Sequence, residues 1–153
     1  MSEVLIFFAT QTGNAETAAE MIRDHLRARG LAASIINIAH LTMEKFLEPR
    51  VVIGTASTWG DGEPPDDAID FWEALGALSG QPLATHRFAI YALGDSCYDE
   101  FCAFGKNLDA AFERLGAQRL VARHDCDIDF EDDIAPWASR VADALLASPL
   151  AAC

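Results

Sequence analysis

Apolar residues in this chain are gathered into short continuous runs, and longer segments of mixed polarity separate the runs. The runs cover residues 4–9, 33–38, 51–56, 88–93 and 119–123. Each run has the length of a strand, and continuous apolar character without alternation is typical of strands that are buried on both faces. We therefore predict one strand from each run, in the interior of the protein.

The segments between the runs have the spacing of amphipathic helices. The first places apolar residues on one face and ends in a helix stop signal: Ala15, Ala18, Ala19, Ile22 and Leu26, followed by Gly30. Further helices are predicted over residues 66–78, 101–115 and 132–146, with a short helical turn over residues 40–47. Trp72 and Trp137 fall on the apolar stripes of two of these helices, which predicts that both pack in the core.

Strands that alternate with helices pair in parallel through right-handed crossovers, which place helices on both faces of the sheet. The predicted fold class is therefore α/β, with a doubly wound, five-stranded parallel sheet. A chain of 153 residues, half of them apolar, is long enough for one core of ordinary size and too short for two. We expect a single globular domain over residues 1–153.

The charge balance limits the partners of this domain. Lys and Arg total 11 against 24 Asp and Glu, a net charge of −13, which opposes binding to nucleic acid and to anionic membranes. The four cysteines have neither disulfide-framework nor zinc-ligand spacing, the histidines suggest no metal site, and no segment is apolar enough to cross a bilayer. We expect a cytoplasmic monomer whose protein partners carry a basic face.

In a doubly wound sheet, ligands bind beyond the carboxyl ends of the strands, so the loops that follow the strands are the places to search. The loop after the first strand reads TQTGNA, residues 10–15. Gly13 allows a tight turn into the helix, and the hydroxyls, the Asn14 amide and the free N–H groups of the helix start can all donate to one anion. The loop lacks the Lys of a nucleoside triphosphate loop and the glycines of a dinucleotide loop. Taken alone, it also fits an ordinary capped helix.

Two later loops favour a planar ligand. Trp59 lies in a glycine-rich turn after the third strand, and Tyr98 lies in the turn after the fourth strand. One exposed aromatic residue is common, but two on neighbouring loops at the same sheet edge are better explained by a flat heterocycle held between them.

Four segments together resemble the flavodoxins, and also the FMN domains of the sulfite reductase flavoprotein and of cytochrome P450 reductase. They are TQTGNAE, STWGDGEPPDD, ALGDSCYDEFCAFGKNLDAAFERLGAQRL and DCDID, and they span nearly the whole chain. The resemblance implies the strand order 2-1-3-4-5, with FMN bound where the order reverses. Because the fifth strand is predicted to run uninterrupted into its loop, the chain resembles the short form of the family.

The resemblance also implies roles for individual residues. The FMN phosphate would be held by Thr10, Gln11, Thr12, Gly13, Asn14 and Ala15, and the isoalloxazine ring would lie between Trp59 and Tyr98. The ring and ribityl chain would be lined by Ser57, Thr58, Gly60, Leu93, Gly94, Asp95 and Phe101. Asp125 matches an acidic position that approaches FMN in the reductase domains, although neighbouring Asp127 is an alternative match. No catalytic side chain and no metal ligand are implied.

The function predicted from the sequence is one-electron transfer through FMN. The carrier would take low-potential electrons from a separate NAD(P)H-dependent flavoprotein reductase and pass them to a redox acceptor protein. Residues 51–86 contain six acidic residues and no Lys or Arg, and residues 125–133 contain six more, again without Lys or Arg. Such charge disfavours electron addition to the flavin and favours docking to basic partners. Two alternatives remain open: an FMN-dependent NAD(P)H quinone reductase, and a flavin-free interaction module of the same fold.

Overall fold

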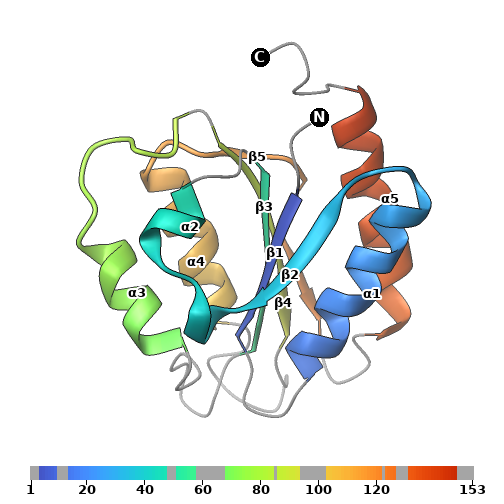
Figure 1. Ribbon diagram of the computed structural model, residues 1–153, viewed down its shortest axis with the longest axis horizontal. Coiled ribbons are helices and arrows are strands. Elements are labelled where there is room, and N and C mark those ends of the chain that lie inside the picture. The colour runs from blue at the N-terminus through green and yellow to red at the C-terminus, as the bar shows by residue number, and fades with distance from the viewer. Residues whose placement is uncertain are drawn as a thin grey trace.

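The computed structural model describes residues 4–9, 14–47, 51–57, 68–84, 86–93, 103–121, 123–126 and 131–147. The elements in these ranges are, in chain order, β1 (Val4–Ala9), α1 (Asn14–Ala28), β2 (Ala33–Asn37), η1 (Ile38–His40), α2 (Met43–Leu47), β3 (Val51–Ser57), α3 (Ile69–Gly76), β4 (Arg87–Leu93), α4 (Ala103–Arg114), β5 (Gln118–Arg119), β6 (His124–Cys126) and α5 (Glu131–Ala147). Figure 1 shows their arrangement around a central sheet.

The strands form one parallel sheet in the order β2-β1-β3-β4-β5, and β6 pairs with β4 beyond β5. Every pairing is parallel, with Ile6 beside Ile35 on β2 and beside Ile53 on β3. The strand order therefore reverses between β1 and β3. This topology confirms the predicted doubly wound fold and its order 2-1-3-4-5.

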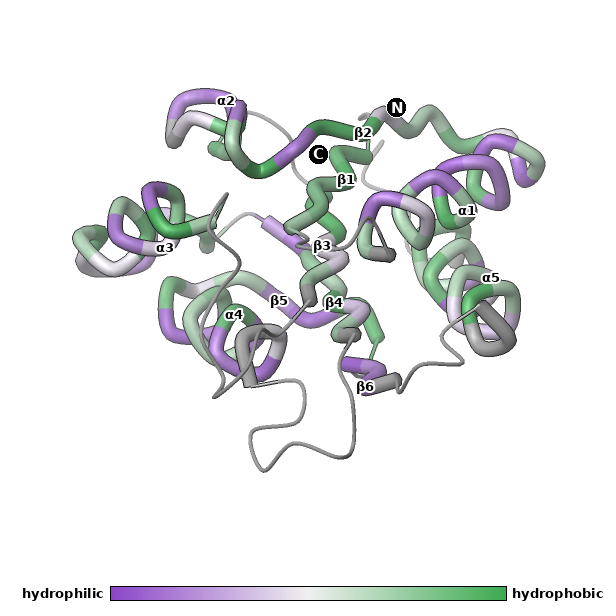
Figure 2. Tube along the Cα trace, turned by 90° about the horizontal axis from the view of Figure 1, so that it is seen from below, coloured by the Kyte–Doolittle hydropathy of each residue, from purple (hydrophilic) through white to green (hydrophobic). Residues whose placement is uncertain are grey.

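Two helix layers enclose the sheet. Helices α1 and α5 cover one face, and α3 and α4, with the short α2, cover the other (Figures 1 and 2). Alternate residues of β1 enter the two cores: Ile6 belongs to the same core cluster as Trp137 of α5, whereas Phe7 belongs to the other cluster, where its ring lies beside that of Phe112 of α4. Burial on both faces explains why β1, β3 and β4 read as continuous apolar runs.

Most boundaries agree with the sequence prediction. Helix α1 ends as expected, because Gly30 follows it with a φ of 83°, a conformation that favours glycine. Trp137 is fully buried, as predicted, but Trp72 is only half-buried on α3. Strand β2 also differs from the prediction: past Ala33 its residues are half-buried, because an edge strand has a neighbour on one side only.

The prediction of one uninterrupted fifth strand over residues 119–123 is wrong. Strand β5 ends at Arg119 and β6 begins at His124. On β4, Phe88 pairs with Arg119 and Tyr91 pairs with His124. Two residues of β4 therefore lie opposite four residues of the other chain segment, so the fifth strand bulges by two residues. The intervening segment is four residues long, and the strand therefore carries no long insertion.

None of the helices that the structure describes combines the length and the apolar character needed to cross a bilayer.

Candidate functional site

The carboxyl ends of four strands meet at one edge of the sheet. Register pairs Ala9 at the end of β1 with Ala56, and Ser57 at the end of β3 with Leu93 at the end of β4. Leu93 in turn pairs with Cys126 at the end of β6. In Figure 1 this edge is at the bottom of the sheet, and α1 begins there too. The loops predicted to bind a ligand thus leave the sheet from adjacent positions.

Helix α1 presents its N-terminus at this edge. The helix begins at Asn14, and Ala15 is fully buried. The first N–H groups of a helix have no partner within the helix, and with the helix dipole they favour an anion. The first turn contains the exposed acidic residue Glu16 and no basic residue. The described first turn of α1 therefore offers an anion neutral donors only.

A buried hydroxyl fixes the first turn of α1 against the sheet. Thr55 of β3 is fully buried, and its Oγ1 donates a hydrogen bond of 2.8 Å to the carbonyl oxygen of Ala15. The carbonyl oxygen of Phe7 lies 3.4 Å from the same hydroxyl. Thr55 therefore positions the start of α1, a role that no pattern in the sequence had indicated.

Two glycines allow close packing around the strand ends. A Cβ atom on Gly54 of β3 would lie 2.5 Å from Cζ of Phe7, and one on Gly105 of α4 would overlap the side chain of Ala92 on β4. Helix α4 consequently lies directly on the end of β4, and the small side chains there keep the edge compact.

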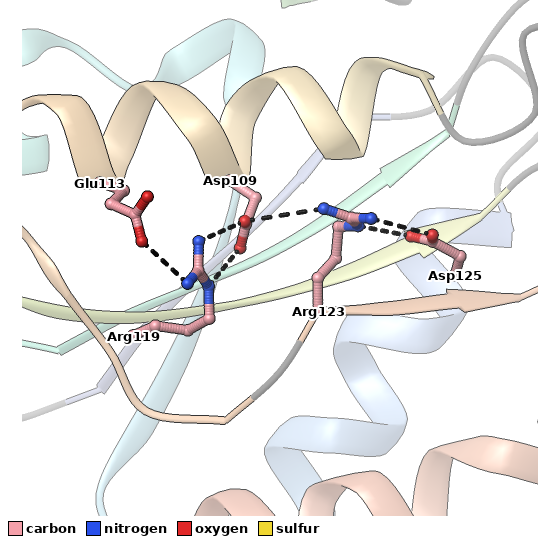
Figure 3. Close-up of polar contacts among 5 residues, drawn as sticks. All are labelled: Asp109, Glu113, Arg119, Arg123 and Asp125. Atoms are coloured by element: carbon pink, nitrogen blue, oxygen red, sulfur yellow. Dashed lines mark hydrogen bonds and ion pairs between the residues drawn. The ribbon is translucent and has the colours of Figure 1, made fainter.

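Asp125 is the one predicted acidic ligand whose side chain the structure describes, and it is already paired. Arg123 binds it through both ends of the guanidinium: Nε lies 2.7 Å from Oδ1, and Nη2 lies 3.2 Å from Oδ2 (Figure 3). The two side chains are 27% and 24% exposed, so solvent screens this pair only in part. The hydrogen bond that Arg123 donates to Asp125 raises the pKa of Arg123, against the opposing effect of burial.

Arg123 also belongs to a larger ion cluster. Its Nη1 lies 3.7 Å from Oδ2 of Asp109 on α4, a carboxylate that is 8% exposed. Arg119 binds the same carboxylate at 3.0 and 2.5 Å, and it contacts Glu113 at 2.9 Å (Figure 3). The hydrogen bond that Arg119 donates to Asp109 raises the pKa of Arg119 above its ordinary value, against the opposing effect of burial. A raised Arg pKa stabilises the fold fully at every pH below the ordinary Arg pKa, and this contribution is lost only as the pH rises above that range.

The predicted site residues divide into two groups. Five lie within the described residues, all at the carboxyl edge: Asn14, Ala15, Ser57, Leu93 and Asp125. The others lie outside the described residues: Thr10, Gln11, Thr12, Gly13, Thr58, Trp59, Gly60, Gly94, Asp95, Tyr98 and Phe101, together with Asp127. No role was predicted for Thr55 or Arg123. Neither residue has a signal in the local sequence, because Thr55 bonds to another element and Arg123 depends on the direction of its side chain.

A separate groove lies between α3 and α4. It has a volume of about 300 Å³ and is lined by Trp72, Gly76, Asn107, Ala110, Ala111 and Arg114. Gly76 and Arg114 are the last residues of their helices, so the groove extends toward the amino ends of the strands, away from the candidate site. Within the described residues, no group of three His, Cys, Asp or Glu side chains is placed to hold a metal ion.

Comparison with known proteins identifies the family. The family model described as Flavodoxin matches residues 6–137. The chain belongs to the flavodoxin family. Over 153 residues it is 36% identical to the sulfite reductase (NADPH) flavoprotein alpha-component of Escherichia coli K12 and to its counterpart from Shigella boydii serotype 4. The match covers 99% of this chain and 26% of those relatives, so the chain spans about a quarter of their length.

Solved structures of flavodoxins give the same result. The flavodoxin of Streptococcus pneumoniae TIGR4 is 32% identical, with a TM-score of 0.84 over 95% of this chain and 99% of that one. A variant of a flavodoxin from Pseudomonas aeruginosa is 29% identical, with a TM-score of 0.81 over 94% of this chain and 99% of that one. A short-chain flavodoxin associated with a bacterial microcompartment is 24% identical, with a TM-score of 0.84 over 96% of this chain and 98% of that one, and it supports the fold alone.

Membership of this flavodoxin family implies FMN as the cofactor. The described part of the edge fits such a ligand. The N-terminus of α1 suits a phosphate monoester, since it offers neutral donors at the point where the strand order reverses. The ends of β1, β3, β4 and β6, from which the predicted ligand-binding loops leave, lie side by side in the sheet.

Proposed function

We propose that this flavodoxin carries single electrons on FMN between two partner proteins. The donor is a separate NAD(P)H-dependent flavoprotein reductase, and the acceptor is a redox protein with a basic docking face. The observation that carries the proposal is the convergence of the strand ends on the N-terminus of α1 in a chain that matches the flavodoxin model. When bound, FMN supplies the redox chemistry, and the protein supplies its binding and electrostatic surroundings.

The protein residues divide into binding and lining groups. In the proposal, the phosphate is held by the N–H groups of Asn14 and Ala15 together with Thr10, Gln11, Thr12 and Gly13. Trp59 and Tyr98 flank the ring and exclude water from its faces, and the remaining predicted residues line the ring and the ribityl chain. Thr55 positions the phosphate end through its hydrogen bond to Ala15.

Acidic charge around the site supports transfer between proteins. Asp70 and Glu73 are exposed on α3, and they belong to the stretch of residues 51–86 that has no Lys or Arg. Negative charge near a flavin disfavours the addition of electrons, and it attracts a basic partner. The relatives named sulfite reductase (NADPH) flavoprotein support a link to NADPH-derived electrons. A single domain, a monomeric state and a cytoplasmic location remain predictions.

An anaerobic reductive titration of the purified protein with FMN tests the proposal. We expect stoichiometric binding and, at half reduction, an absorbance band at longer wavelength than that of oxidised flavin. Direct passage to the fully reduced form, together with NAD(P)H oxidation by a quinone in the absence of a reductase, would support the quinone reductase alternative. A protein that leaves added FMN free in solution would support the flavin-free module.

A further inference from the structure

The Asp125 carboxylate stands at the carboxyl end of β6, where the proposed FMN site begins. In register it pairs with Ala92, next to Leu93 at the end of β4. Residues 125–133 form an acidic segment that contains no basic residue of its own. The structure places the guanidinium of Arg123 directly on the first carboxylate of this segment.

The bulge in the fifth strand brings the two arginines together. Arg119 and His124 pair with β4 residues three positions apart, about 10 Å along a parallel strand, instead of the roughly 17 Å expected for five positions. Both guanidinium groups therefore reach the nearly buried Asp109 of α4. Asp109 holds Arg123 from the side opposite to Asp125 and fixes where its charge lies (Figure 3).

We propose that Arg123 is a positioning residue for flavin reduction: held between Asp109 and Asp125, it neutralises the Asp125 carboxylate and makes the reduction potential of bound FMN less negative. The inference rests on the proposed function. Reduction adds negative charge to the ring unless a proton accompanies each electron, so an unpaired carboxylate nearby weakens the binding of reduced FMN relative to oxidised FMN.

The test compares the reduction potentials of FMN bound to wild type and to Arg123→Gln, measured by anaerobic equilibration with dye standards. We expect Arg123→Gln to weaken the binding of reduced relative to oxidised FMN by roughly threefold to tenfold, and tenfold equals about 59 mV for a one-electron couple. Arg123→Lys keeps the charge and restores most of the potential. Asp125→Asn removes the carboxylate while Asp109 still holds the guanidinium of Arg123, and it shifts the potential the opposite way, to a less negative value.

A matched control separates this effect from structural damage. Arg119→Gln removes a guanidinium from the same cluster, but this guanidinium binds Asp109 and Glu113, whereas that of Arg123 binds Asp125. It should lower stability to urea and shift the potential less than Arg123→Gln does. An equal potential shift in Arg119→Gln would overturn the inference in favour of net charge.

The double variant Arg123→Gln with Asp125→Asn tests whether Arg123 acts through Asp125. We expect its potential to lie close to that of wild type, because the pair carries no net charge in either protein. If the double variant keeps the more negative potential of Arg123→Gln, the shift does not come from the Asp125 charge and the inference is wrong. If Arg123→Gln does not fold, an unchanged or more negative potential in Asp125→Asn overturns the inference. Failure of wild type to bind FMN would instead defeat the proposed function, and unaltered potentials in FMN-loaded variants would defeat only the inference.

Discussion

The hydroxyl of Thr55 on β3 donates a hydrogen bond to the carbonyl of Ala15, 40 positions earlier in the chain and in the first turn of α1. This bond joins the strand that carries the third loop to the helix that ends the first loop. It is fully buried, so water cannot replace it. The orientation of the proposed phosphate site consequently depends on a residue that does not itself contact the ligand.

Thr55→Val should therefore weaken both folding and FMN binding. The variant keeps the side-chain shape but removes the donor, and we expect unfolding in urea to show a loss of about 1–2 kcal/mol. FMN affinity should fall because the helix N-terminus is less well held, which a fluorescence titration of the apoprotein would measure. Thr55→Ser, which retains the hydroxyl, is the control. Equal FMN affinities in Thr55→Val and wild type would contradict the positioning role.

Replacement of Glu16 by Gln should have opposite effects on the apoprotein and on the complex. An acidic residue in the first turn stabilises an isolated helix, so the apoprotein should lose about 0.3–1 kcal/mol. The same charge repels a bound phosphate, so we expect the dissociation constant of FMN to fall by about twofold to fivefold at low salt. Titrations at low and high salt measure the effect. Glu20→Gln, one turn further along, is the matched control and should show a smaller change.

Adding a methyl group at Gly54 should destabilise the fold. The new Cβ would lie 2.5 Å from the ring of buried Phe7, and overpacking of this kind costs about 1–3 kcal/mol. Gly76→Ala is the control, because a Cβ there would have no atom within 4 Å and alanine favours a helix more than glycine does. Urea unfolding should show a loss for Gly54→Ala and a small gain for Gly76→Ala. A neutral Gly54→Ala would mean that Phe7 can move aside.

Loss of the shared carboxylate should cost more than loss of its exposed neighbour. Asp109→Asn removes the negative charge that two arginines bind, and we expect the free energy of unfolding to fall by about 2–3 kcal/mol. Glu113→Gln affects a side chain that is 63% exposed and has one contact with Arg119, so its loss should be below about 1 kcal/mol. Chemical unfolding at neutral pH measures both, and similar losses would contradict a central role for Asp109.

The sequence predicted the elements of this fold better than the contacts between them. The run of residues 4–9 predicted β1 because a strand buried on both faces has few polar positions. Gly30 marked the end of α1 because glycine readily adopts the positive φ that follows a helix. These signals depend on neighbouring residues alone. The family resemblance then supplied the ligand, which the family match confirms.

Contacts between distant residues had no local signal. Thr55 reads as an ordinary strand residue until its partner in α1 is known. The break after Arg119 was missed because Leu120 and Val121 continue the apolar run, whereas the register depends on β4 and on Asp109 of α4. The pairing of Asp125 with Arg123 was not predicted, since it requires both side chains to leave the strand on the same side.

The bulge between β5 and β6 also bears on how this protein tolerates changes in chain length. Two extra residues are absorbed there while β4 keeps parallel pairing on either side, from Phe88 with Arg119 to Tyr91 with His124. The sheet thus restores its register within a short span of the fifth strand, and a change in the length of this segment need not alter the pairing on either side. Evolution can lengthen or shorten the fifth strand here without moving the loops that gather at the carboxyl edge of the sheet.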